Sequence, residues 1–132
     1  MQQINTEIKP TLNDMRYYTY GDYFIKEDGT LKFEIVDYGN DDYTYLTLIH
    51  EMIECFLVRK KGITMEQIDE YDIAFENDIE RVKKYLEPGA DPTCPYKEEH
   101  EYADSVLKEI CRKTGLDFEE YVTTDLDGKT EN

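Results

Sequence analysis

The 132-residue sequence contains no tryptophan, and its three cysteines, Cys55, Cys94 and Cys111, are far apart. Three is an odd number, and no two cysteines form a C-x-x-C pair, so neither a disulfide framework nor a cysteine zinc knuckle is expected. No apolar run approaches the roughly 20 residues of a membrane-spanning helix. The polar N-terminal segment also lacks the apolar core of a signal peptide. These absences predict a cytoplasmic protein.

Basic residues are scarce, since 15 Lys and Arg face 31 Asp and Glu and give a formal net charge of −16. Nucleic-acid backbones and anionic membrane surfaces are both bound through Lys/Arg patches, so neither is an expected partner. An acidic surface instead suits a cationic partner or divalent ions. The partner, any substrate and the oligomeric state stay open. The length predicts a single domain over 1–132 with a hydrophobic core of its own.

The pattern of apolar residues predicts an α+β fold, in which an N-terminal β-hairpin packs on a bundle of three main helices. Residues 1–16 show no strong pattern and are expected to be a loose arm. An aromatic-rich run, an Asp-Gly turn at 28–29 and strict alternation over 31–35 predict a hairpin within 17–36. Capping signals place the helices within 42–122, at 42–60, 65–86 and 97–114, with a short last helix through Tyr121. Residues 123–132 read as a polar tail.

The first helix, 42–60, carries a histidine and a glutamate one turn apart. At 3.6 residues per turn, its apolar residues form one stripe, made of Leu46, Ile49, Ile53, Phe56 and Leu57. His50 and Glu54 lie side by side at the edge of that stripe, because residues four apart share a helix face. Burying an imidazole or a carboxylate without a partner is costly, and one metal ion bound by both would satisfy the pair.

Two further polar residues fall on the inward faces of the other helices. Asp72 lies in the middle of the apolar stripe of 65–86, and His100, the only other histidine, borders the inward face of 97–114. Two imidazoles with carboxylates suit Zn²⁺ or another divalent transition metal. The hypothesis is that His50, Glu54 and His100 bind the ion. Asp72 is then either a fourth ligand or a partner that orients a histidine.

A plainer interpretation exists for the same residues. In it, His50 is a histidine at the edge of the core that bonds a backbone carbonyl, and His100 is an exposed residue in the first turn of a helix. Asp72 forms a buried ion pair with a histidine.

Glu51 directly follows His50, as the glutamate does in the H-E-x-x-H motif of metallopeptidases, where it polarises a metal-bound water. Here Glu54 stands in the place of the second histidine, which makes the motif less specific. The leading hypothesis is nevertheless a small metal-binding protein acting as a zinc-dependent hydrolase of metallopeptidase type. In it, Glu51 is the general base.

The chain also resembles a family of small phage and bacterial mobile-element proteins for which no activity is established. The resemblance covers most of residues 20–122, and is carried in order by Gly21-Asp22-Tyr23, Glu27-Asp28-Gly29-Thr30-Leu31, His50-Glu51-Met52-Ile53-Glu54, Tyr71-Asp72, Glu87-Pro88-Gly89-Ala90-Asp91-Pro92, Pro95-Tyr96 and Glu99-His100. It implies that Asp72 and the Pro-Tyr and Glu-His pairs belong with the His50 motif. Phage-repressor-cleaving metallopeptidases are similar to this chain only through the His-Glu pair.

Two other functions remain open. Glu51 and Glu54, followed by Glu66 and Asp69, resemble the Mg²⁺-binding pattern of all-α nucleotide pyrophosphohydrolases, although the spacing is short. The non-enzymatic alternative is a phage-type accessory protein that binds a partner through its acidic surface. Tyrosine is common at interfaces, and the candidate contact residues are Tyr17, Tyr18, Tyr20 and Tyr23.

Overall fold

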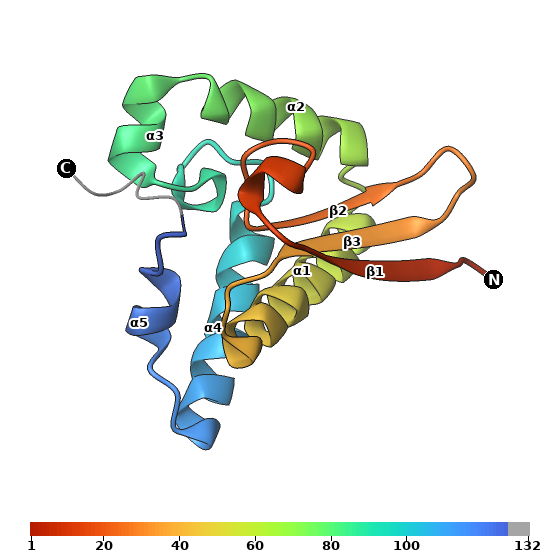
Figure 1. Cartoon of the computed structure of the whole chain (residues 1–132). Coiled ribbons are helices and arrows are strands. Elements are labelled where there is room, and N and C mark those ends of the chain that lie inside the picture. The colour runs from red at the N-terminus through yellow and green to blue at the C-terminus, as the bar shows by residue number, and fades with distance from the viewer. Residues whose placement is uncertain (127–132) are drawn as a thin grey trace.

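A three-stranded sheet at the N-terminus is followed by a series of helices, which confirms the predicted α+β class (Figure 1). The computed structural model describes residues 1–126. The strands are β1 (Ile4–Lys9), β2 (Gly21–Ile25) and β3 (Leu31–Val36), in the spatial order β1-β3-β2. Strands β2 and β3 form the predicted antiparallel hairpin. Its turn contains Gly29 at a φ of 89°, a conformation that favours glycine.

The prediction of a loose arm over residues 1–16 is wrong. Strand β1 lies in this segment and pairs in parallel with β3, from Ile4 beside Leu31 to Lys9 beside Val36. A short 3₁₀ helix, η1 (Leu12–Asp14), follows it. Strand β1 is exposed along nearly its whole length, so its sequence carries little of the apolar signal that marks a buried strand. Its conformation comes from pairing with β3.

The helices mostly follow their capping residues. They are α1 (Asp41–Lys61), α2 (Met65–Glu76), α3 (Ile79–Tyr85), η2 (Pro88–Ala90), α4 (Lys97–Thr114) and α5 (Phe118–Val122). The side chain of Asn40 accepts a hydrogen bond from the Tyr43 amide at the start of α1, and Gly62 ends α1 at a φ of 85°. The predictions for α1 and α4 are confirmed to within one residue at each end.

The single helix predicted over 65–86 is instead two helices. Helix α2 ends at Glu76, and the side chain of Asp78 accepts a hydrogen bond from the Arg81 amide to begin α3. The apolar stripe breaks with the helix, because Ile79 and Leu86 are 67% and 60% exposed. Of the predicted polar tail, 123–126 follow α5 without regular structure, and 127–132 lie outside the described residues.

Helix α1 is the centre of the molecule, because it contacts strands β2 and β3 as well as helix α4 (Figure 1). Its buried residues are Leu46, Thr47, His50, Glu54, Cys55 and Val58. The predicted apolar stripe was therefore misplaced, and Phe56 is 60% exposed. Since the sheet and α4 both flank α1, its buried face is centred on His50 and Glu54, which lie inside the molecule.

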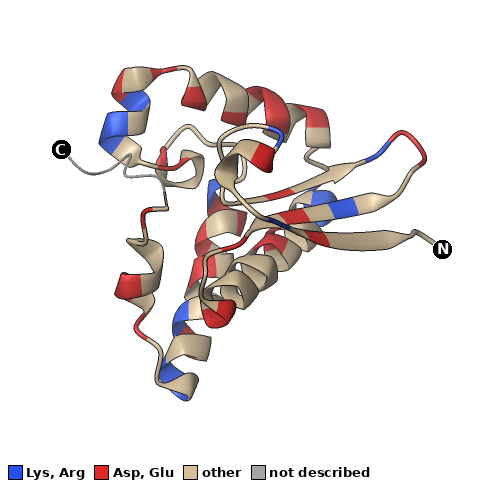
Figure 2. Ribbon diagram, in the orientation of Figure 1, with Lys and Arg blue, Asp and Glu red and all other residues tan. Residues whose placement is uncertain are grey.

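Acidic residues are spread over most helices and loops, with far fewer Lys and Arg among them (Figure 2). None of the helices within the described residues is long and apolar enough to cross a membrane.

Candidate metal centre

Three polar atoms from α1 and α4 converge on one point between the two helices. His50 Nε2 lies 3.2 Å from His100 Nδ1, and each of these nitrogens lies 3.1 Å from Glu54 Oε2. His50 and Glu54 face each other because they are one turn apart on α1, and the packing of α4 on α1 brings His100 to them. The structure thus brings together the three residues predicted as metal ligands.

The outer atom of each of these three groups has a hydrogen-bond partner of its own. His50 Nδ1 lies 3.0 Å from Asp104 Oδ1, and His100 Nε2 lies 3.1 Å from Glu87 Oε1. On Glu54, Oε1 accepts a hydrogen bond of 2.8 Å from the Tyr23 hydroxyl. In the neutral tautomer that carries its N–H on the outer nitrogen, each imidazole donates to a carboxylate and leaves the lone pair of its inner nitrogen facing the convergence point. Partners of this kind orient metal ligands in known sites.

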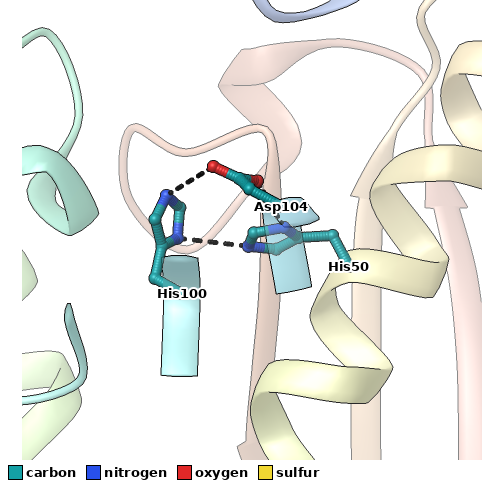
Figure 3. A group of neighbouring side chains, drawn as sticks. All are labelled: His50, His100 and Asp104. Carbon is teal, nitrogen blue, oxygen red and sulfur yellow. Dashed lines mark hydrogen bonds and ion pairs between the residues drawn. The ribbon is translucent and has the colours of Figure 1, made fainter. Parts of the chain in front are cut away.

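His50, His100 and Asp104 form a group that could hold a metal ion, since one ligand atom from each lies within 4.8 Å of the others, and Glu54 is not part of this group. Figure 3 shows the Asp104 carboxylate beside both imidazole rings, which meet at an interplanar angle of 69°. Asp104 Oδ2 also lies 3.4 Å from His100 Nε2. Sequence reasoning missed Asp104, although it is one turn after His100 and next to the buried Ala103.

The carboxylates change the proton affinity of both imidazoles. Burial opposes protonation of His50, but hydrogen bonds with Asp104 and Glu54 outweigh it and raise the pKa of His50 to about 10. Burial likewise opposes protonation of His100, and Glu54 and Glu87 raise its pKa to about 11. Burial would raise the pKa of Glu54, but the two imidazoles hold it well below its ordinary value. The site therefore attracts cations, either protons or a metal ion.

Glu51, the predicted general base, lies against strand β2. A Cβ atom added to Gly21 would be 2.8 Å from both Cγ and Oε1 of Glu51, so the glutamate side chain occupies the space that the glycine leaves. Burial, together with the charge of Glu54, raises the pKa of Glu51 well above its ordinary value. No contact tests the catalytic role, which stays a prediction.

Asp72 is buried as predicted, but its oxygens have tyrosine partners. Tyr17 donates a hydrogen bond of 2.9 Å to Oδ2, and Tyr96 donates one to Oδ1. Burial raises the pKa of Asp72 to about 7, although both hydroxyl groups act to lower it. Within residues 1–126, the group that could hold a metal ion does not include Asp72. Its role as ligand or orienting partner stays a prediction.

The residues of the two alternative functions have partners elsewhere. Asp69 forms an ion pair with Arg16 at 3.0 Å, and Glu66 is exposed in the first turn of α2. None of the four tyrosines proposed as a contact surface is strongly exposed, and Tyr23 is only 3% exposed. Most of these side chains therefore support the fold.

Comparisons with protein-family models, with curated proteins and with solved structures found no match for this chain.

Proposed function

We propose that this protein binds one divalent transition-metal ion through His50 Nε2, His100 Nδ1 and Glu54 Oε2. The observation that carries the proposal is the triangle of these atoms, with edges of 3.1 to 3.2 Å. Metal–ligand bonds of about 2.0 to 2.2 Å place neighbouring ligand atoms roughly 3.0 to 3.5 Å apart. In this arrangement Asp104 and Glu87 accept the outer N–H groups of the imidazoles, and Tyr23 fixes the Glu54 carboxylate.

The facing lone pairs also support a bound cation. With both outer nitrogens protonated, the two inner nitrogens and Glu54 Oε2 present lone pairs to one another at about van der Waals contact. This arrangement is repulsive unless a cation lies among the three atoms. Extra protons on the imidazoles would serve, and a metal ion would serve with all three groups as ligands, so the experiment must separate the two.

The ligand set favours Zn²⁺, which is often held by histidine and carboxylate, although Mn²⁺, Fe²⁺ and Ni²⁺ accept the same groups. Three protein ligands leave a coordination position for a substrate or water, as in catalytic zinc sites. We extend the proposal to a zinc-dependent hydrolase in which Glu51 takes the proton from the attacking water. In support, Glu51 directly follows His50, as the glutamate does in H-E-x-x-H, and its carboxyl interacts electrostatically with both His50 and His100.

The test is elemental analysis of tag-free protein, purified with and without added zinc. Wild type is expected to hold about one ion per chain. His50→Ala, His100→Ala and Glu54→Gln should each lose it, and Asp104→Asn should bind it more weakly. Absence of metal from zinc-treated wild type would show that protons balance the site, and the proposal would be abandoned.

Hydrolysis is tested separately with a library of internally quenched fluorogenic peptides. The Glu51→Gln variant should keep its zinc and lose cleavage, because the amide cannot accept a proton from water. Cleavage that survives in Glu51→Gln would remove Glu51 from the mechanism. A zinc-loaded wild type that cleaves none of the peptides would restrict the proposal to metal binding.

A further inference from the structure

One face of the His100 ring is covered by backbone from the turn that precedes α4. A Cβ atom added to Gly89 would lie 2.4 Å from both Cγ and Cδ2 of His100, and 2.6 Å from Nδ1. Such distances are far inside van der Waals contact, so only glycine leaves room for the ring in its present position. The backbone of Gly89 therefore packs directly on the face of the imidazole, over Cγ and the two ring atoms bonded to it.

The same turn also holds the outer nitrogen of the ring. Glu87, two residues before Gly89, places Oε1 3.1 Å from His100 Nε2. Leu86, immediately before Glu87, has a φ of 69° and is the only described non-glycine residue with a positive φ. Its side chain is 60% exposed, so burial of Leu86 does not explain this strained conformation. Strained backbone often marks a functional position.

Buried contacts fix the end of the turn that leads toward α4. The guanidinium of Arg81 donates two hydrogen bonds to Asp91 Oδ2, at 2.9 and 2.8 Å. Asp91 Oδ1 accepts two more from the amide and hydroxyl of Thr93, each at 2.9 Å. Asp91 itself is only 3% exposed. The segment from α3 to α4 is thus tied at its base and has little freedom to move away from His100.

We propose that residues 86–89 form a positioning turn that fixes the His100 ring with Nδ1 directed at the metal. Gly89 limits rotation of the ring by contact with its face, and Glu87 selects the tautomer with the proton on Nε2. The proposal rests on the proposed function, because it assigns these residues a role only at that metal site. It adds two residues that neither bind the metal nor take part in a reaction.

The physical gain is preorganisation of a ligand. A free histidine side chain samples several rotamers and both tautomers, and binding must select one of each. A ring that is already held in one orientation loses less conformational freedom when the ion binds. Displacing the ring removes this gain and also moves Nδ1 out of the triangle with His50 Nε2 and Glu54 Oε2.

The decisive experiment compares zinc dissociation constants of wild type, Gly89→Ala and Gly115→Ala, measured by competition with a chromophoric chelator. Gly115→Ala is the control for lost stability without a clash, because Gly115 has a φ of 77° and its added Cβ would meet no atom within 4 Å, whereas Gly89 does not have a positive φ and its added Cβ would clash with His100. That variant should lose stability from backbone strain and keep its zinc affinity. Gly89→Ala should bind zinc about 10- to 100-fold more weakly, the usual effect of losing a partner that orients a ligand.

Glu87 provides a second test that does not depend on a steric clash. Its side chain is 57% exposed, so Glu87→Ala should fold normally while its zinc affinity falls about tenfold. Glu87→Gln keeps an acceptor oxygen and should recover most of that loss. Imidazole nitrogen NMR signals of the zinc-loaded protein should show His100 with metal on Nδ1 and a proton on Nε2, and Gly89→Ala should lose this signature.

The outcomes separate the two proposals. If wild type binds no zinc, the metal site itself is wrong. If wild type binds zinc and both Gly89→Ala and Glu87→Ala bind it equally well, the metal site stands and the positioning turn is wrong. Thermal unfolding of each metal-free variant measures its loss of stability. Gly115→Ala then shows whether a loss of stability alone weakens zinc binding.

Discussion

At the scale of single residues, the most unusual group outside the metal site is the buried carboxyl of Asp72. Burial raises its pKa from 3.8 to about 7 in the folded protein. At pH values between these two pKa values, Asp72 is ionised in the unfolded chain and still protonated in the folded protein. Folding is therefore favoured at low pH by this group, and the advantage disappears as the pH rises from about 4 to about 7.

We therefore expect Asp72→Asn to gain stability relative to wild type as the pH rises. The full pKa difference corresponds to at most about 4 kcal/mol in the free energy of unfolding, and the opposing hydrogen bonds from Tyr17 and Tyr96 are already included in that pKa. Urea unfolding of both proteins with a chelator present, at pH 4.5 and pH 8, measures the change. A difference between the two proteins that is the same at both pH values would contradict the assigned pKa.

The proposed metal ligands could be predicted from sequence to the extent that helix geometry alone decides them. His50 and Glu54 share a face of α1 by their spacing, and the amphipathic pattern of α4 turns His100 inward. The positions of Asp104 and Glu87 beside the histidines depend on which side of α4 packs on α1 and on the path of the turn before α4. Both are set by tertiary packing, which the local sequence does not show. Asp72 was correctly predicted as buried, because its place in a helical stripe fixes the direction of its side chain. The stripe does not show which groups that side chain meets, so its two tyrosine partners were not predicted.

At the scale of secondary-structure elements, the boundary between α2 and α3 depends on one capping residue. The Asp78 side chain accepts a hydrogen bond of 3.2 Å from the Arg81 amide. Arg81 in turn holds Asp91 at the base of the positioning turn, so the start of α3 is linked mechanically to the metal site.

Asp78→Ala should lower the free energy of unfolding by about 1 kcal/mol, the usual cost of losing an N-cap. Asn77→Ala is a suitable control, because Asn77 precedes the cap with a helical φ of −82° and its role in ending α2 comes from its backbone N–H. Chemical denaturation of the three proteins measures the effect. Equal loss in both variants would mean that the junction itself is sensitive and that the Asp78 cap has no special role.

The elements that were not predicted are those that local apolar periodicity does not mark. Strand β1 is an exposed edge strand, and β3 supplies its hydrogen bonds across more than twenty intervening residues. The α2–α3 break was missed because Ile79, Val82 and Leu86 continue a helical apolar period, which the capping preference of Asp78 overrides. Elements with strong local signals at both ends, such as α1 with Asn40 and Gly62, were predicted well.

At the scale of the whole molecule, the proposed metal site would join the two central helices. Helix α1 carries two of the proposed ligands and α4 the third, and α1 also supports the sheet. With a net charge of −16, the chain repels itself, and a divalent cation bound inside offsets part of that repulsion. An ion that binds only the folded state stabilises it by mass action.

Zinc should accordingly raise the stability of wild type by about 2.7 kcal/mol when its free concentration is 100 times the dissociation constant. The gain should diminish at lower pH, because protons compete with the metal for His50 and His100, whose pKa values are raised to about 10 and about 11. Thermal unfolding of wild type and His100→Ala, each with zinc or with chelator at pH 6 and pH 8, measures both effects. His100→Ala should show little response to zinc. An equal response in the two proteins would mean that zinc acts through the acidic surface and that α1 and α4 are not joined by it.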